Sequence, residues 1–112
     1  MLWNRTPATP QIREMTPAEV HDALQRQAIV LVDVREVQEH VAERIDGSLL
    51  HPLSQFDPAA LPAGDKPVVL YCAVGRRSAA AVAKCLAAGV AVSAHLTGGL
   101  QAWKAARLPT TR

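Results

Sequence analysis

Apolar residues gather along the chain in short runs that predict strands. The runs at residues 29–34 (IVLVDV) and 67–71 (PVVLY) are almost unbroken, which is typical of strands covered on both faces of a sheet. Residues 47–53 (GSLLHPL) predict a brief strand that Pro52 ends, and residues 90–96 (VAVSAHL) predict a further strand.

The stretches between these runs carry helix signals. Residues 15–27 contain Thr16, Pro17 and Glu19, which make a capping box with proline at the first helical position, so they predict a helix. The alanine-rich stretch at residues 78–88 favours a helix, and Gly89 is placed to end it. Two further predicted helices span residues 36–45 and 100–106.

Strands that alternate with helices indicate an α/β fold with a doubly wound parallel sheet and helices on both faces. The 112 residues fit one domain, residues 1–112, in which residues 1–10 predict a loose lead-in because they lack a periodic pattern. A hydrophobic content of 49% and a charged content of 20% fit a soluble globular chain with its own core.

The charge balance argues against several classes of partner. Twelve basic and ten acidic residues give a net charge of +2, which is too even for a nucleic-acid or anionic-membrane partner. No segment approaches the ~18 apolar residues of a membrane span, and the first ten residues lack the apolar core of a secretory signal. Two cysteines make no disulfide framework, so we expect a cytoplasmic protein with free thiols. The four histidines show no ligand spacing, so no metal and no cofactor is expected.

The two cysteines stand in different settings. Cys72 follows the strand 67–71, at the carboxyl end where sites form in parallel sheets, and a helix begins about six residues later. Cys85 stands at helical spacing with Val82 and Leu86, so we expect it in the core, with a resolving thiol as the lesser alternative. Only Cys72 therefore has the position of a reactive group.

The segment after Cys72 has the features of an anion-binding loop. Its amides and the helix N-terminus form a nest of positive potential, and Gly75 lets the backbone turn tightly. Such surroundings lower a cysteine pKa from ~8.5 and favour the nucleophilic thiolate. We therefore predict that Cys72 is the nucleophile of the site. The predicted loop consists of Ala73, Val74, Gly75, Arg76, Arg77 and Ser78.

Four motifs in order resemble the single-domain rhodanese family of sulfurtransferases, from about Glu14 to Pro109. They are CAVGRRS at 72–78, LVDVRE at 31–36, RIDGSLLHPL at 44–53 and LTGGLQAW at 96–103. The resemblance implies a rhodanese-like parallel sheet of about five strands. It also implies a sulfur-transfer reaction through a persulfide on Cys72. The donor would be a small anion such as thiosulfate, or a persulfide. The acceptor would be a thiol, cyanide or a sulfur-relay protein.

Two other functions stay open. Cysteine-dependent phosphatases and arsenate reductases use a Cys-x5-Arg loop, whereas here Arg77 comes one position earlier and Ser78 takes the sixth place. A catalytically idle rhodanese-like binding module is the other alternative. It is favoured by Ala73, where active members of the family often carry arginine, and by departures from the family pattern at residues 43–48.

Several other residues carry weaker predictions. Asp33 and Arg35 lie on the same rim as Cys72, where Asp33 would anchor the loop or its arginine and Arg35 would orient neighbouring segments. A structural ion pair between them is the simpler alternative. Arg77 is predicted to stabilise the loop and its bound anion, with Arg76 projecting outward. His95 is expected to be a strand residue with a hydrogen-bonded ring, with a base as the lesser alternative. Gly98 and Gly99 are expected to make a close turn beside the loop, and Trp103 to anchor the core.

Overall fold

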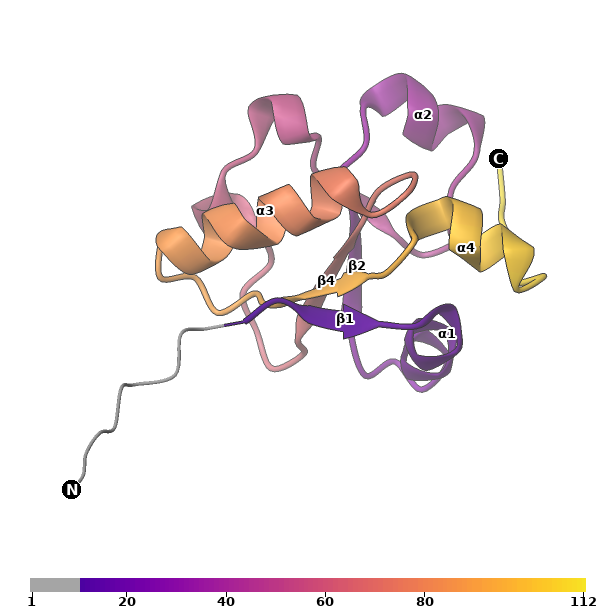
Figure 1. The fold of residues 1–112 in the computed structure, drawn as a ribbon, viewed down its shortest axis with the longest axis horizontal. Coiled ribbons are helices and arrows are strands. Elements are labelled where there is room, and N and C mark those ends of the chain that lie inside the picture. Colours follow the sequence, from indigo (N-terminus) through magenta and orange to yellow (C-terminus); the bar gives the residue numbers. More distant parts are fainter. Residues whose placement is uncertain (1–10) are drawn as a thin grey trace.

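A computed structural model describes residues 11–112 of the protein (Figure 1). The predicted lead-in at residues 1–10 lies outside the described residues, and the assignment of residues 1–112 to one domain stays a prediction. No helix in the described part of the chain is long and apolar enough to cross a bilayer. The elements are β1 (Arg13–Met15), α1 (Pro17–Gln25), β2 (Val30–Asp33), α2 (Val37–Ala42), β3 (Leu49–Leu50), two 3₁₀ turns (Leu53–Gln55 and Pro58–Ala60), β4 (Val68–Tyr71), α3 (Arg76–Ala87), β5 (Ala94–Leu96) and α4 (Gly99–Ala105).

The strands form one five-stranded sheet in the order β1-β5-β4-β2-β3, and every neighbouring pair is parallel. This confirms the predicted α/β fold with a sheet of about five strands. Strand β1 was not among the strands predicted from the pattern. Two of its three residues are exposed, so it shows no apolar run. Its position comes from pairing with β5, in which Glu14 lies opposite His95.

Each face of the sheet packs against its own set of helices, as predicted. One core contains Val20 of α1 and Trp103 of α4 against odd-numbered residues of β2 and β4 such as Leu31 and Val69. The other contains residues of α3, including Cys85, against even-numbered residues of β2 and β4 such as Leu70. Figure 1 shows α3 and α1 on opposite sides of the strands. The period of two along a strand explains why alternate residues join different cores.

The ends of two helices decide the geometry of the site. The capping box of α1 is present as predicted, with the Thr16 amide donating to Glu19 at 2.9 Å. Helix α3 begins at Arg76, two residues before the predicted start. Gly75 precedes it as N-cap with φ +101°, a left-handed conformation that glycine adopts without the Cβ penalty of other residues. The first turn of α3 therefore starts within the loop that follows Cys72.

Candidate active site

Cys72 follows β4, which lies between β5 and β2 in the middle of the sheet. Parallel strands end at one common edge, so the residue stands where α/β folds place their sites. Its side chain belongs to the core on the α3 side and has an exposed fraction of 0%. The sulfur is therefore covered in this conformation, and a reactant meets it only when a covering group moves aside.

The loop amides point at the sulfur of Cys72. The Gly75 amide lies 3.1 Å and the Ser78 amide 3.3 Å from Sγ, and the Ser78 hydroxyl lies 3.5 Å from it. Burial raises the pKa of the Cys72 thiol. Hydrogen bonds from the Ser78 side chain and from the amides of Ser78, Gly75 and Val74 outweigh burial, so the pKa lies below its ordinary value. The arrangement favours a thiolate, because each hydrogen bond to a charged group contributes about 1.5–3 kcal/mol.

The N-terminal turn of α4 anchors the backbone of the loop. The carbonyls of Cys72 and Ala73 accept hydrogen bonds from the amides of Leu100 at 2.8 Å and Gln101 at 2.9 Å. Gly99 lies so close that an added Cβ would stand 2.6 Å from the Ala73 carbonyl carbon. The close turn expected at Gly98 and Gly99 is thus confirmed, and it fixes the start of the loop.

The outer side of the loop borders a small hollow. Val74 is half exposed, and Ala73 is partly buried beside it. The hollow measures about 270 Å³ and is lined by Ala73, Val74, Leu100, Gln101 and Lys104. Apolar side chains, one glutamine and one lysine thus border the loop beside Ala73.

The two loop arginines have different surroundings. Arg76 is exposed, as expected. Arg77 donates from Nη1 and Nη2 to the Glu39 carboxylate at 2.7 and 3.0 Å, and this pairing lowers the pKa of Glu39 to about 2. The negative charges of Glu39 and Cys72 raise the pKa of Arg77. Arg77 therefore links α3 to α2 here, and its predicted contact with a bound anion stays a prediction.

Asp33 and Arg35 form the buried ion pair that was their simpler interpretation. Arg35 Nη2 lies 2.7 Å from Asp33 Oδ2, and Arg35 also donates to the Glu43 carbonyl. His40 Nδ1 lies 2.9 Å from the same Asp33 oxygen. Within residues 11–112, neither Asp33 nor Arg35 is hydrogen-bonded to a side chain of the Cys72 loop. The pair holds the segment after β2, and a supporting role toward the loop stays a prediction.

Two residues near the site were not predicted for it. Glu39 lies in α2 and reaches Arg77 across the gap between helices. His95 lies in β5 opposite Leu70 of β4, so its side chain lies on the α3 face together with Cys72. Its Nδ1 atom lies 2.7 Å from Ser78 Oγ, which confirms the expected hydrogen-bonded ring. The alternation of strand residues is a signal for this placement once β5 is known to neighbour β4.

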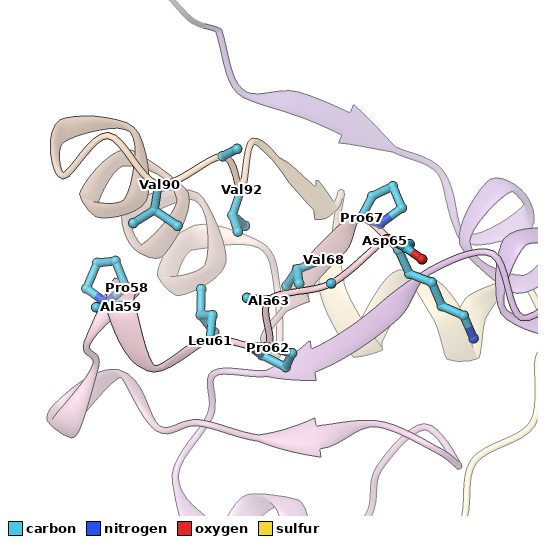
Figure 2. Close-up of a pocket in the computed structure, with 13 residues that line it drawn as sticks. Pro58, Ala59, Leu61, Pro62, Ala63, Asp65, Pro67, Val68, Val90 and Val92 are labelled. Carbon is cyan, nitrogen blue, oxygen red and sulfur yellow. The ribbon is translucent and has the colours of Figure 1, made fainter.

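Another cavity lies away from this site. It measures about 540 Å³ and is drawn in Figure 2. Val68 at the start of β4 contributes to its wall, whereas Cys72 follows the other end of that strand.

Cys85 lies in the α3 core, where burial raises the pKa of its thiol, as expected for a packing residue. Across residues 11–112, no three or more histidine, cysteine or acidic side chains gather where a metal ion would bind.

The family model of the Rhodanese-like domain matches residues 16–106. The chain belongs to the rhodanese-like domain family. Its sequence is 42% identical over 99 residues to the uncharacterized protein slr1261 of Synechocystis, over 88% of this chain and 55% of that protein. It is 34% identical over 91 residues to thiosulfate sulfurtransferase GlpE of Pseudomonas fluorescens, over 79% of this chain and 82% of that protein.

The fold of this rhodanese-like domain is shared with solved structures. The crystal structure of a rhodanese-related protein from Thermoplasma volcanium superposes with a TM-score of 0.77 at 29% identity, over 88% of this chain and 97% of that one. The chain spans about half the length of slr1261, the first relative named above. The domain match and the relative named as a thiosulfate sulfurtransferase support a place in the sulfurtransferase family.

Proposed function

We propose that this rhodanese-like domain is a sulfurtransferase that carries a sulfane sulfur as a persulfide on Cys72. The observation that carries the proposal is the convergence of the Gly75 and Ser78 amides on Cys72 Sγ, at 3.1 and 3.3 Å. These donors stabilise a thiolate, and the thiolate is the nucleophilic form of cysteine. The relative GlpE, named as a thiosulfate sulfurtransferase, supports the same reaction class.

The reaction has two halves. In the first, the Cys72 thiolate attacks the outer sulfur of a donor such as thiosulfate. The new sulfur–sulfur bond forms as the donor's own sulfur–sulfur bond breaks, and sulfite leaves with the electron pair. In the second, cyanide or an acceptor thiolate attacks the terminal persulfide sulfur. The acceptor keeps that sulfur, and Cys72 leaves as the thiolate.

The short loop favours sulfur over phosphate. The arginine of a phosphatase loop stands six residues after the cysteine, and here Arg77 stands five residues after it. Arg77 is paired with Glu39 at 2.7 Å. The amides at Gly75 and Ser78 lie within hydrogen-bond distance of Sγ itself. This geometry supports a single charged sulfur at the start of the helix, whereas a phosphoryl group needs a wider ring of donors and a free arginine.

The covering of Cys72 favours a second candidate, an idle binding module. With an exposed fraction of 0%, the thiol meets no reactant without a movement of the loop. Ala73 also leaves the loop without the arginine that would attract a dianionic donor. A module that binds a partner through the surface around Val74 would need no such movement.

One assay separates these functions. The protein is incubated with thiosulfate and cyanide, and thiocyanate is measured for the unaltered chain and for a Cys72→Ser variant. We expect thiocyanate formation that the substitution abolishes. Parallel reactions use a small-molecule persulfide in place of thiosulfate, because Ala73 weakens the attraction for a dianion. Cyanide also takes sulfur from a persulfide without a catalyst, so the rate with Cys72→Ser is the background. Thiocyanate formation no faster than this background with both donors refutes the sulfurtransferase and favours the binding module.

A further inference from the structure

A buried polar chain continues from the sulfur of Cys72 into the protein. Ser78 Oγ lies 3.5 Å from Cys72 Sγ and 2.7 Å from His95 Nδ1. The exposed fractions are 0% for Cys72, 0% for Ser78 and 4% for His95. A buried imidazole is thus connected through a buried hydroxyl to the thiol of the proposed nucleophile.

We propose that His95, acting through Ser78, accepts the proton of the Cys72 thiol and thereby sets the protonation state of the nucleophile. The proposal deepens the proposed sulfur transfer at Cys72. His95 does not contact the reacting sulfur, so it is a positioning residue that works through the Ser78 hydroxyl.

The hydrogens of the chain can be followed in both states. With a neutral thiol, Sγ–H donates to Ser78 Oγ, the Ser78 hydroxyl donates to His95 Nδ1, and the neutral ring keeps its proton on Nε2. On ionisation, the sulfur proton moves to Ser78 Oγ and the hydroxyl proton moves to His95 Nδ1. The products are a thiolate and an imidazolium. The Ser78 hydroxyl then donates to Sγ, and Nδ1–H donates to Ser78 Oγ.

The competing acceptor for the Ser78 hydroxyl is the Gly75 carbonyl, at 3.2 Å. The imidazole is closer, at 2.7 Å, so it is the favoured acceptor in the thiol state. The ring also lies close to Gly75, since an added Cβ there would stand 3.8 Å from a ring carbon of His95. The imidazole therefore lies beside the loop, on the sheet side.

The groups around His95 decide where an imidazolium is stable. The pKa of His95 lies below its ordinary value, because burial lowers it and the Glu14 carboxylate, which lies opposite it on β1, offsets this only in part. The titratable groups that face the ring are therefore Glu14 from β1 and Cys72 from the end of β4, while α3 presents Ser78. Arg77 of α3 adds positive charge near Cys72 but is paired with Glu39. Burial disfavours a lone imidazolium, so its charge is stable here only beside the thiolate.

The test measures the pH dependence of Cys72 alkylation by iodoacetamide, in a Cys85→Ser background so that only one thiol reacts. His95→Asn keeps a hydrogen-bonding amide near Nδ1 but removes the proton acceptor. We expect the apparent pKa of Cys72 to rise by about one unit, which lowers the alkylation rate below the midpoint about tenfold. Ser78→Ala should raise the apparent pKa of Cys72 by a similar amount. Combining Ser78→Ala with His95→Asn should raise this pKa little further, because the two groups act in series.

A matched histidine serves as control. His51→Asn alters a ring that bonds to Asp57, away from Cys72, and should leave the alkylation profile unchanged. An unchanged profile in His95→Asn overturns the proposal. If His95→Asn does not fold, the unaltered protein gives the answer by NMR. The His95 ring should then keep its proton above the midpoint of Cys72 alkylation, and it should lose that proton at lower pH in Cys72→Ser, where no thiolate stabilises it.

The test also separates the relay from the sulfur transfer. Alkylation requires neither donor nor acceptor sulfur. A shifted alkylation profile without thiocyanate formation would refute the transfer and support the relay. Thiocyanate formation with an unshifted profile would support the transfer and refute the relay.

Discussion

Gly99 gives a sharp test of how α4 holds the Cys72 loop. The residue has φ +61°, and an added Cβ would lie 2.6 Å from the carbonyl carbon and oxygen of Ala73. A Gly99→Ala variant therefore combines two costs. The left-handed backbone costs an alanine about 1 kcal/mol. The contact with the loop carbonyls forces the backbone apart, which adds about 1–3 kcal/mol.

Gly89→Ala is the matched control. Gly89 has φ +72°, and nothing lies within 4 Å of an added Cβ. We expect it to lose only the conformational part, about 1 kcal/mol, whereas Gly99→Ala should lose about 2–4 kcal/mol. The free energies of unfolding follow from urea titrations, and alkylation of Cys72 reports the loop. Equal stability of the two variants, or full reactivity of Cys72 toward iodoacetamide in Gly99→Ala, would show that the start of α4 does not hold the loop.

Other substitutions test the surroundings of the site. Tyr71→Phe removes buried hydrogen bonds to the Ile45 amide at 3.2 Å and to Ser48 Oγ at 3.0 Å, so denaturant titration should show a loss of about 1–2 kcal/mol with Cys72 alkylation unchanged. Glu39→Gln removes the partner of Arg77. The folded pKa of Glu39 is lowered from 4.5 to about 2, so its stabilisation is present above pH 4.5 and is lost as the pH falls toward 2. The free energy of unfolding of the unaltered protein should thus fall toward that of Glu39→Gln across this window. Near neutral pH the free energies of unfolding of the two proteins should differ by about 1 kcal/mol, because solvent screens this partly exposed ion pair. A gap that does not narrow with acid would refute this account of the pair.

The sequence predicted the central strands and the position of Cys72 at a strand end because both depend on local signals. The apolar runs at residues 29–34 and 67–71 became β2 and β4, and the capping box at Thr16 started α1 where expected. Cys72 stood out through the strand before it and the glycine after it, and these are neighbours along the chain. Such features form under rules that act over a few residues.

The remaining contacts depend on which distant elements become neighbours. Strand β1 has one buried residue in three, and only its pairing with β5 makes it a strand. The bond between Ser78 and His95 requires β5 to lie beside β4 with a given register. The pairing of Arg77 with Glu39 requires α2 to pack near the start of α3. Sequence spacing carries no information on such distances, so these partners appear only in three dimensions.

A persulfide on Cys72 adds the mass of one sulfur atom, so the intact mass after incubation with a sulfur donor detects it. The unaltered protein, Cys72→Ser and Cys85→Ser are each incubated with thiosulfate or a small persulfide and weighed by native mass spectrometry. We expect one added sulfur atom on the unaltered protein and on Cys85→Ser, none on Cys72→Ser, and its removal by cyanide. Cys85 is buried in the core on the α3 side of the sheet, and its replacement leaves the Cys72 thiol in place. Sulfur that persists on Cys72→Ser, or no sulfur on the unaltered protein with either donor, would contradict a persulfide at Cys72.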